Sequence, residues 1–133
     1  MAKPILQPSE LELQVLSLLW KHGPMTVRDV LEMMPDGKKR AYTTILSVMQ
    51  VMEKKGLLTH RQDGNKNVYR PSRPRQKILG PILRNMVRNV FGDSPSAAMQ
   101  FLLEESEISD SELQAIRQML DDRKQQSKGG KKQ

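Results

Sequence analysis

The sequence predicts a mainly α-helical fold with one small β-hairpin, divided into an N-terminal and a C-terminal part. Apolar residues recur with a helical period over most of the chain. The period changes to that of strands only between residues 57 and 70, and Pro71 and Pro74 follow directly. At 133 residues, the chain has room for one domain or two small ones. We therefore expect domains at residues 1–73 and 74–124.

The first two helices have clear start signals. Ser9 followed by Glu12 has the spacing of a capping box, in which each residue satisfies a backbone N–H of the other. Thr26 followed by Asp29 repeats that spacing at the start of a short second helix. Gly23-Pro24 lies between the two and predicts the end of the first helix. Two short-linked helices are expected.

A third helix is predicted from about residue 40 to 55, ending at Gly56. Its apolar residues recur at helical spacing and form one stripe: Ile45, Val48, Met49 and Met52. The opposite side carries polar residues: Tyr42, Thr43, Thr44, Ser47, Gln50 and Lys54. This helix should therefore bury one side and expose a polar one.

A β-hairpin should follow the third helix. Residues 57–62 and 67–70 have strand composition, and the Gly-containing segment 63–66 between them predicts the turn. The arms and tip carry Arg61, Lys66 and Arg70.

The C-terminal part should contain three helices, the first over residues 78–91 with Gly80-Pro81 kinking it or delaying its start. Each helix has one apolar stripe, and the expected dimer interface consists of Ile82, Leu83, Met86, Val90, Phe91, Met99, Leu102, Leu103, Leu113, Ile116 and Leu120. About 50 residues of such helices rarely bury enough surface alone, so we expect association with a second copy. Folding back onto the N-terminal part is the alternative. The basic tail, 125–133, lacks apolar residues and is expected to be disordered.

Composition and charge restrict the function. The chain has no Cys and only His22 and His60, which excludes disulfides, thiolate metal sites and Cys nucleophiles and disfavours a His-rich metal site. It lacks a signal peptide and an apolar run that could span a membrane, so we expect a cytoplasmic protein without membrane insertion. The net charge is +7, and residues 36–77 hold 11 Lys/Arg against 3 Asp/Glu. This local excess favours a polyanion as partner.

The order of three helices and a basic hairpin is that of a winged helix-turn-helix. The major groove of DNA admits one α-helix, whose first residues reach the base edges. Thr and Ser hydroxyls can bond to bases there, and cations beside the helix can neutralise phosphates. The candidate DNA-binding residues are Lys38, Lys39, Arg40, Ala41, Tyr42, Thr43, Thr44, Ser47, Lys54, Arg61 and Lys66.

Other functions remain open. A winged-helix module that binds proteins, without sequence-specific DNA binding, would have acidic or apolar groups exposed on the third helix. An enzyme is disfavoured because the sequence has no G-x-S-x-G elbow, phosphate loop or H-E-x-x-H motif. A small ligand in the dimer interface is a third alternative. No cofactor is expected.

The chain resembles the penicillinase-repressor family, bacterial transcription factors that control β-lactamase and methicillin-resistance genes. The resemblance covers about residues 8–124. Its most specific motifs are Ala-Tyr-Thr-Thr at 41–44, Lys-Lys-Gly at 54–56 and Val-Tyr-Arg-Pro at 68–71.

The resemblance implies a homodimeric repressor that binds a palindromic promoter operator through the winged helix and dimerises through its C-terminal helices. Thr43, Thr44 and Ser47 match the DNA-facing positions. In inducible members, a membrane sensor protease detects the β-lactam, and the repressor is cut at an Asn-Phe bond. The matching dipeptide here is Gln100-Phe101, a departure that leaves proteolytic release open. The operator, the target genes and the inducing signal do not follow from the sequence.

Overall fold

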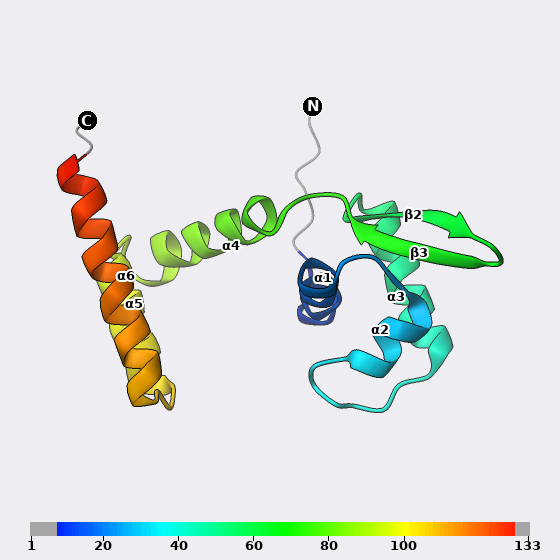
Figure 1. Cartoon of the computed structure of the whole chain (residues 1–133), viewed down its shortest axis with the longest axis horizontal. Coiled ribbons are helices and arrows are strands. Elements are labelled where there is room, and N and C mark those ends of the chain that lie inside the picture. Colours follow the sequence, from blue (N-terminus) through cyan, green and yellow to red (C-terminus); the bar gives the residue numbers. More distant parts are fainter. Residues whose placement is uncertain (1–7, 130–133) are drawn as a thin grey trace. The chain divides into compact units, whose positions relative to one another are not determined.

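The computed structural model describes residues 8–129, in which six helices and three strands are assigned. Figure 1 shows the helices and the two strands of the hairpin. The chain divides into two compact units, with the boundary between Asn85 and Met86. In chain order the elements are α1 (Glu10–His22), β1 (Met25–Thr26), α2 (Val27–Met33), α3 (Tyr42–Lys54), β2 (Leu58–Asp63), β3 (Lys66–Pro71), α4 (Arg75–Val90), α5 (Pro95–Glu105) and α6 (Asp110–Gly129). The mainly helical class with a small sheet is confirmed.

The predicted helix starts of the first unit are confirmed. In α1, the Glu12 amide donates to Ser9 Oγ at 3.1 Å, and the Ser9 amide donates to Glu12 Oε1 at 3.0 Å. Thr26 and Asp29 form the same reciprocal pair at the start of α2. Gly23 ends α1 with a φ of +89°, where a residue with a Cβ would be strained. These local signals fix where the chain turns between α1 and α2.

One hydrophobic core unites α1, α2, α3 and the sheet. Its buried members are Val15, Leu16, Leu18, Leu19, Met25, Val27, Val30, Met34, Ile45, Met49, Met52, Leu57, Leu58, Tyr69 and Ile78. The core is aliphatic except for Tyr69, in keeping with an aromatic content of 4%. The predicted stripe of α3 supplies Ile45, Met49 and Met52, all 0% exposed, whereas Val48 is only partly buried.

The hairpin belongs to a three-stranded antiparallel sheet of order β1-β3-β2. The short strand β1, which pairs Met25 with Tyr69, was not predicted from the sequence. The turn is also tighter than expected: Asp63 pairs with Lys66, leaving a two-residue loop with Gly64 at a φ of +65°. Glycine suits the first loop position of a type II′ turn, where φ is positive. The added strand holds the hairpin to the helix-turn-helix.

A nearly buried ion pair joins α1 to the end of α3. Lys55 Nζ lies 2.8 and 3.0 Å from the two carboxylate oxygens of Glu12, whose side chain is 7% exposed. The same carboxylate completes the cap of α1. Trp20 adds a second link, because its indole N–H donates to the Arg73 carbonyl oxygen at 3.0 Å. Both contacts join segments far apart in sequence.

Removing one partner of this ion pair should destabilise the fold. Lys55→Met leaves the Glu12 carboxylate largely buried without its cation, which we expect to cost about 3 kcal/mol in the free energy of unfolding measured with urea. The matched control is Lys54→Met, because Lys54 is the exposed neighbouring lysine. Adding Glu12→Gln to Lys55→Met should restore part of the loss. Equal stability of the two lysine variants would contradict this role of the pair.

The structure differs from expectation in α4. The helix begins at Arg75, earlier than predicted, and Pro81 lies inside it, so Gly80-Pro81 does not delay its start. Pro81 removes one backbone donor, which a long helix tolerates when neighbouring turns are fixed by packing. Ile78 is buried in the core of the first unit, and Ile82 packs against that core. The contact boundary consequently lies within α4 rather than near residue 73.

The second unit contains the end of α4 together with α5 and α6. Ser94 caps α5 with Pro95 at its first position, as predicted, and Ser109 Oγ accepts from the Glu112 amide at the start of α6. None of residues 86–127 is buried. Residues 125–129 of the predicted tail form the last part of α6, where Gln, Lys and Ser are compatible with a helix that is already started. Residues 130–133 of the predicted tail lie outside the described residues.

Candidate nucleic-acid interface

The surface of α3 opposite the core is polar. Its members, called the polar face of α3, are Tyr42, Thr43, Thr44, Ser47, Gln50 and Lys54, and all of them are exposed. The buried residues Ile45, Met49 and Met52 fix the rotation of the helix about its axis. The side chains of Thr43, Thr44 and Ser47 therefore point outward as a consequence of core packing. They lie in the first two turns, where a helix entering a groove makes its base contacts.

The first turn of α3 is open to an external acceptor. Ala41 is the N-cap and has no side chain that could accept from the free amides of that turn. The helix dipole adds partial positive charge at this end. This start differs from those of α1 and α2, which are closed by capping boxes. A phosphate or base acceptor beside Tyr42 and Thr43 would meet unsatisfied donors.

The loop before α3 carries three cations, of which one is paired. Lys38 and Lys39 are exposed. Arg40 differs from the expectation of a free cation, since its two terminal nitrogens donate to the two oxygens of Asp36 at 3.0 and 2.7 Å. The Arg40 guanidinium holds the pKa of the Asp36 carboxyl well below its usual range, so the carboxylate stays ionised. The pair is formally neutral.

The hairpin of β2 and β3, residues 58–71, is called the wing, and its strand register places its cations. Arg61 pairs with Val68 and Thr59 pairs with Arg70, so Arg61 and Arg70 share the face of the hairpin opposite Tyr69. Lys66 lies beside the tip and pairs with Asp63. The wing therefore presents exposed cations, including Arg70, which lies outside the predicted set of DNA-binding residues.

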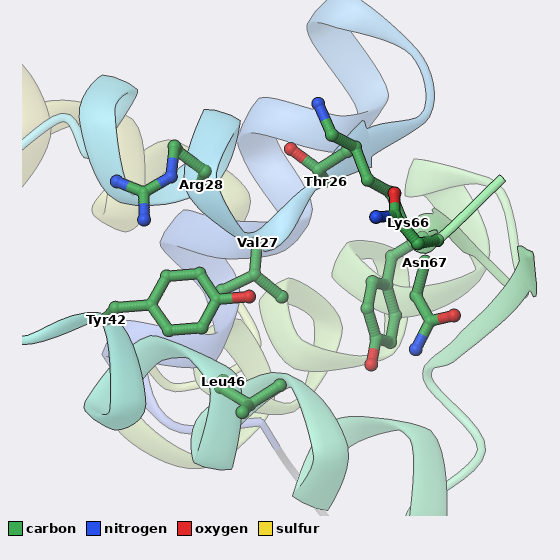
Figure 2. A pocket seen from close by; sticks show the side chains of 9 residues that line it. Thr26, Val27, Arg28, Tyr42, Leu46, Lys66 and Asn67 are labelled. Carbon is green, nitrogen blue, oxygen red and sulfur yellow. The ribbon is translucent and has the colours of Figure 1, made fainter. Parts of the chain in front are cut away.

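A pocket of about 240 Å³ joins α2, α3 and the wing (Figure 2). In Figure 2, Tyr42 of α3 and Arg28 of α2 lie on one side of it, and Lys66 and Asn67 of the wing lie on the other. Asn65 of the wing also lines the pocket. The Arg28 guanidinium carbon lies 5.2 Å from the centre of the Tyr42 ring, within the range of a cation–π contact. The Tyr42 side chain is 40% exposed, so it lines the pocket and is not part of the hydrophobic core.

Sequence reasoning did not identify Arg28, Asn65 and Asn67 as part of the site. The one feature of the sequence that indicates Arg28 is its position in the first turn of α2, just after the predicted N-cap Thr26. The structure brings Lys66 to this pocket with Tyr42, whereas Arg61 does not line it. Lys54 lies at the far end of α3.

The position of β2 is fixed against α3 by His60 and Glu53. His60 Nδ1 lies 2.8 Å from each Glu53 carboxylate oxygen, and its ring centroid lies 5.2 Å from that of Tyr69. Burial raises the pKa of the Tyr69 hydroxyl, which therefore stays protonated at neutral pH. Together these contacts position the hairpin relative to α3.

The residues expected at the dimer interface are mostly exposed. Leu83, Met86, Val90, Met99, Leu102, Leu103, Leu113 and Leu120 are between 39% and 69% exposed. Phe91 and Ile116 are partly buried, and Ile82 differs from expectation in packing against the core of the first unit. Gln100 and Phe101 lie within α5, where the Phe101 ring contacts that of Phe91 at 5.7 Å between centroids. The bond expected as a cleavage site is thus helical.

Comparison with known proteins identifies the family. The family model described as "Penicillinase repressor" matches residues 8–122. The chain belongs to the penicillinase repressor family. The penicillinase repressor of Bacillus licheniformis is 24% identical over 126 residues, which cover 95% of this chain and 98% of that protein. A transcriptional regulator BlaI of Mycobacterium tuberculosis is 30% identical over 114 residues, covering 84% of this chain and 80% of that protein.

Two solved structures of the repressor BlaI are similar to part of this chain. The solution structure of the DNA-binding domain of the repressor BlaI has a TM-score of 0.49 at 30% identity and covers 56% of this chain and 90% of that one. The monomeric form of B. licheniformis BlaI in complex with the blaP half-operator has a TM-score of 0.47 at 29% identity and covers 56% and 92%.

Membership of the penicillinase repressor family confirms the predicted function class, that of a winged-helix transcriptional repressor. Within residues 8–129, no cluster of three or more His, Cys, Asp or Glu side chains could bind a metal ion. Over that same part of the chain, every helix is too short or too polar to cross a bilayer.

Proposed function

We propose that this chain represses transcription as a homodimer, with the polar face of α3 of each copy in the major groove of one half of a palindromic operator. The observation that carries the proposal is the outward row of hydroxyls at the start of α3 in a member of a repressor family. One relative is solved in complex with a half-operator. A repressor of this kind acts in the cytoplasm, where bacterial DNA lies.

The two sets of residues have different roles in this proposal. Thr43, Thr44 and Ser47 contact base edges, where a hydroxyl donates or accepts and the Thr methyl group can touch a thymine methyl. Lys38 and Lys39, with the wing cations, contact phosphates and fix the position of the protein on the duplex. Arg28 joins the second set, since it lies at the start of α2 beside Tyr42.

The phosphate role predicts a specific salt dependence. Lys39→Ala should weaken binding to all DNA sequences by a similar factor and reduce the slope of log K against log salt by about 1 per protomer. Mobility-shift titrations at several salt concentrations measure both quantities. Lys21→Ala is the matched control, since Lys21 is exposed at the end of α1 and lies outside the polar face and the loop. An unchanged slope for Lys39→Ala would exclude it from the phosphate contacts.

A homodimer is supported by the composition of the second unit. Large apolar side chains of α5 and α6 are half-exposed, and none of residues 86–127 is buried. Residues 86–133, which make up the second unit, carry 7 Lys/Arg and 8 Asp/Glu, so two copies can approach without strong net repulsion. Covering these side chains by a second copy would supply the burial that the isolated unit lacks. A two-fold dimer also matches the symmetry of a palindromic operator.

A mobility shift with fragments of the protein's own promoter region tests the function. We expect one promoter fragment to be bound at salt concentrations where random duplexes of equal length are not. Equal affinity for all fragments at every salt concentration would contradict an operator-specific repressor.

A protein-interaction module is the alternative function. It would require apolar or acidic groups on the exposed side of α3. The polar face of α3 contains no acid, and the nearby Glu53 is already paired with His60. The exposed Val51 is the feature that favours this alternative. If Val51→Ser abolished binding to a protein partner but left DNA binding unchanged, that result would support the protein-interaction function.

Release by a membrane sensor protease remains an expectation for this chain. We propose that a cut between Gln100 and Phe101 would abolish operator binding, because it separates half of α5 and all of α6 from the winged helix. The bond is helical, so α5 must open before a protease can bind the extended chain there. Incubation with the sensor protease, followed by mass spectrometry of the fragments, tests the site of cleavage.

A further inference from the structure

The segment before α3 is organised by one carboxylate. Besides the two bonds from Arg40, Asp36 Oδ1 accepts the backbone N–H of Lys38 at 3.1 Å. The Arg40 and Asp36 side chains are 17% and 20% exposed. Gly37, with a φ of +67°, allows the chain to turn back toward the carboxylate. Asp36 thus fixes both the path of the loop and the orientation of one guanidinium.

The pair leaves part of Arg40 available. Its two terminal nitrogens face Asp36 in a fork, which fixes the plane of the guanidinium. Five N–H donors exist on an Arg side chain, so those not used by Asp36 can still meet an acceptor. An oriented Arg can bond two acceptors of a guanine, whereas its charge toward a distant phosphate is cancelled by the adjacent carboxylate.

We propose that Asp36 is a specificity-determining positioning residue: it acts through Arg40 by orienting the guanidinium beside α3 and by neutralising it toward random DNA. This inference rests on the proposed function, since it concerns the same DNA-binding surface. When the protein binds random DNA, phosphate contacts dominate the affinity. The loop then contributes the charges of Lys38 and Lys39, whereas the charge of Arg40 is cancelled by Asp36. At the operator, the fixed guanidinium meets its base without first losing side-chain freedom.

The test is Asp36→Asn, measured with random duplex and with the promoter fragment selected by the wild-type protein. The amide oxygen can still accept from the Lys38 N–H, so the loop should keep its path. We expect affinity for random DNA to rise severalfold, the salt slope to rise by about 1 per protomer, and the operator-to-random ratio to fall by about tenfold. Thermal unfolding of both proteins checks that the fold is unchanged.

Two further variants separate this role from net charge and from stability. Glu32→Gln makes the same charge change on the exposed side of α2 and should leave the affinity ratio nearly unchanged. Asp36→Asn combined with Arg40→Gln restores the net charge of the pair, and its salt slope and random-DNA affinity should return to wild-type values. Because the double variant also lacks the oriented guanidinium, its operator affinity should stay low.

The inference is overturned if Asp36→Asn leaves both the salt slope and the affinity ratio unchanged, or if Glu32→Gln has the same effect as Asp36→Asn. Absence of any fragment preference in the wild-type protein would instead contradict the proposed function. The measurements with random DNA do not require an operator. Failure of the inference about Asp36 can therefore be distinguished from failure of the proposed function.

Discussion

The double substitution of Thr44→Ala and Ser47→Ala should remove most of the discrimination between operator and random DNA. Both side chains are exposed on the same side of α3 and lie within its first two turns. Loss of their contacts in both half-sites should cost about 3 kcal/mol, which is on the order of a hundredfold in operator affinity. Binding to random duplex should change little, because hydroxyls do not neutralise phosphates.

Competition mobility shifts measure this ratio, and urea unfolding provides the check on stability. Neither hydroxyl caps α3, whose N-cap Ala41 receives no side-chain hydrogen bond, so these exposed changes should alter the free energy of unfolding by about 0.5 kcal/mol or less. Ser17→Ala is the matched control, since Ser17 is an exposed hydroxyl residue on α1. Equal loss of operator and random binding would show that α3 provides position but does not read sequence.

Disrupting the apolar side of α5 should have the second large effect. Leu102→Asp combined with Leu103→Asp places two charges among side chains that are 58% and 46% exposed in the single copy. If a second copy covers them, the dimer should dissociate, and operator affinity should fall by about 10² or more because the two half-sites are no longer linked. Sedimentation velocity and mobility shifts on the same samples measure the two consequences.

Gln114→Asp is the matched control for the dimer, because it introduces a charge at a polar, exposed position of α6. A half-site duplex supplies a second comparison. Wild type and the Leu102/Leu103 variant should bind it equally well, since one winged helix suffices there. A variant that remains dimeric at micromolar concentration would place the interface elsewhere.

The sequence alone predicts those structural features that depend on residues close to one another in the chain. The two capping boxes, the glycine end of α1 and the buried stripe of α3 all depend on residues within one or two turns of one another. The outward side of α3 then follows by geometry. The hydroxyl residues of the candidate site could therefore be identified before the fold was known, although their contacts with DNA stay a prediction.

Contacts between distant segments could not be predicted in the same way. The strand β1 has only two residues and exists because β3 pairs with it. The pairing of Lys55 with Glu12 and the stacking of Arg28 on Tyr42 depend on how the helices pack. The Asp36–Arg40 pair is close in sequence, but its loop has no periodic pattern that would indicate which of its charges are paired.

The most direct test of the central claim is an NMR titration of the isotope-labelled protein with the selected promoter fragment. The account predicts that the largest amide shift changes occur at residues 38–47 and at the wing tip, with intermolecular NOEs from the Thr44 methyl group to base protons in the major groove. Shift changes confined to α5 and α6, with no contact between α3 and any base, would contradict it.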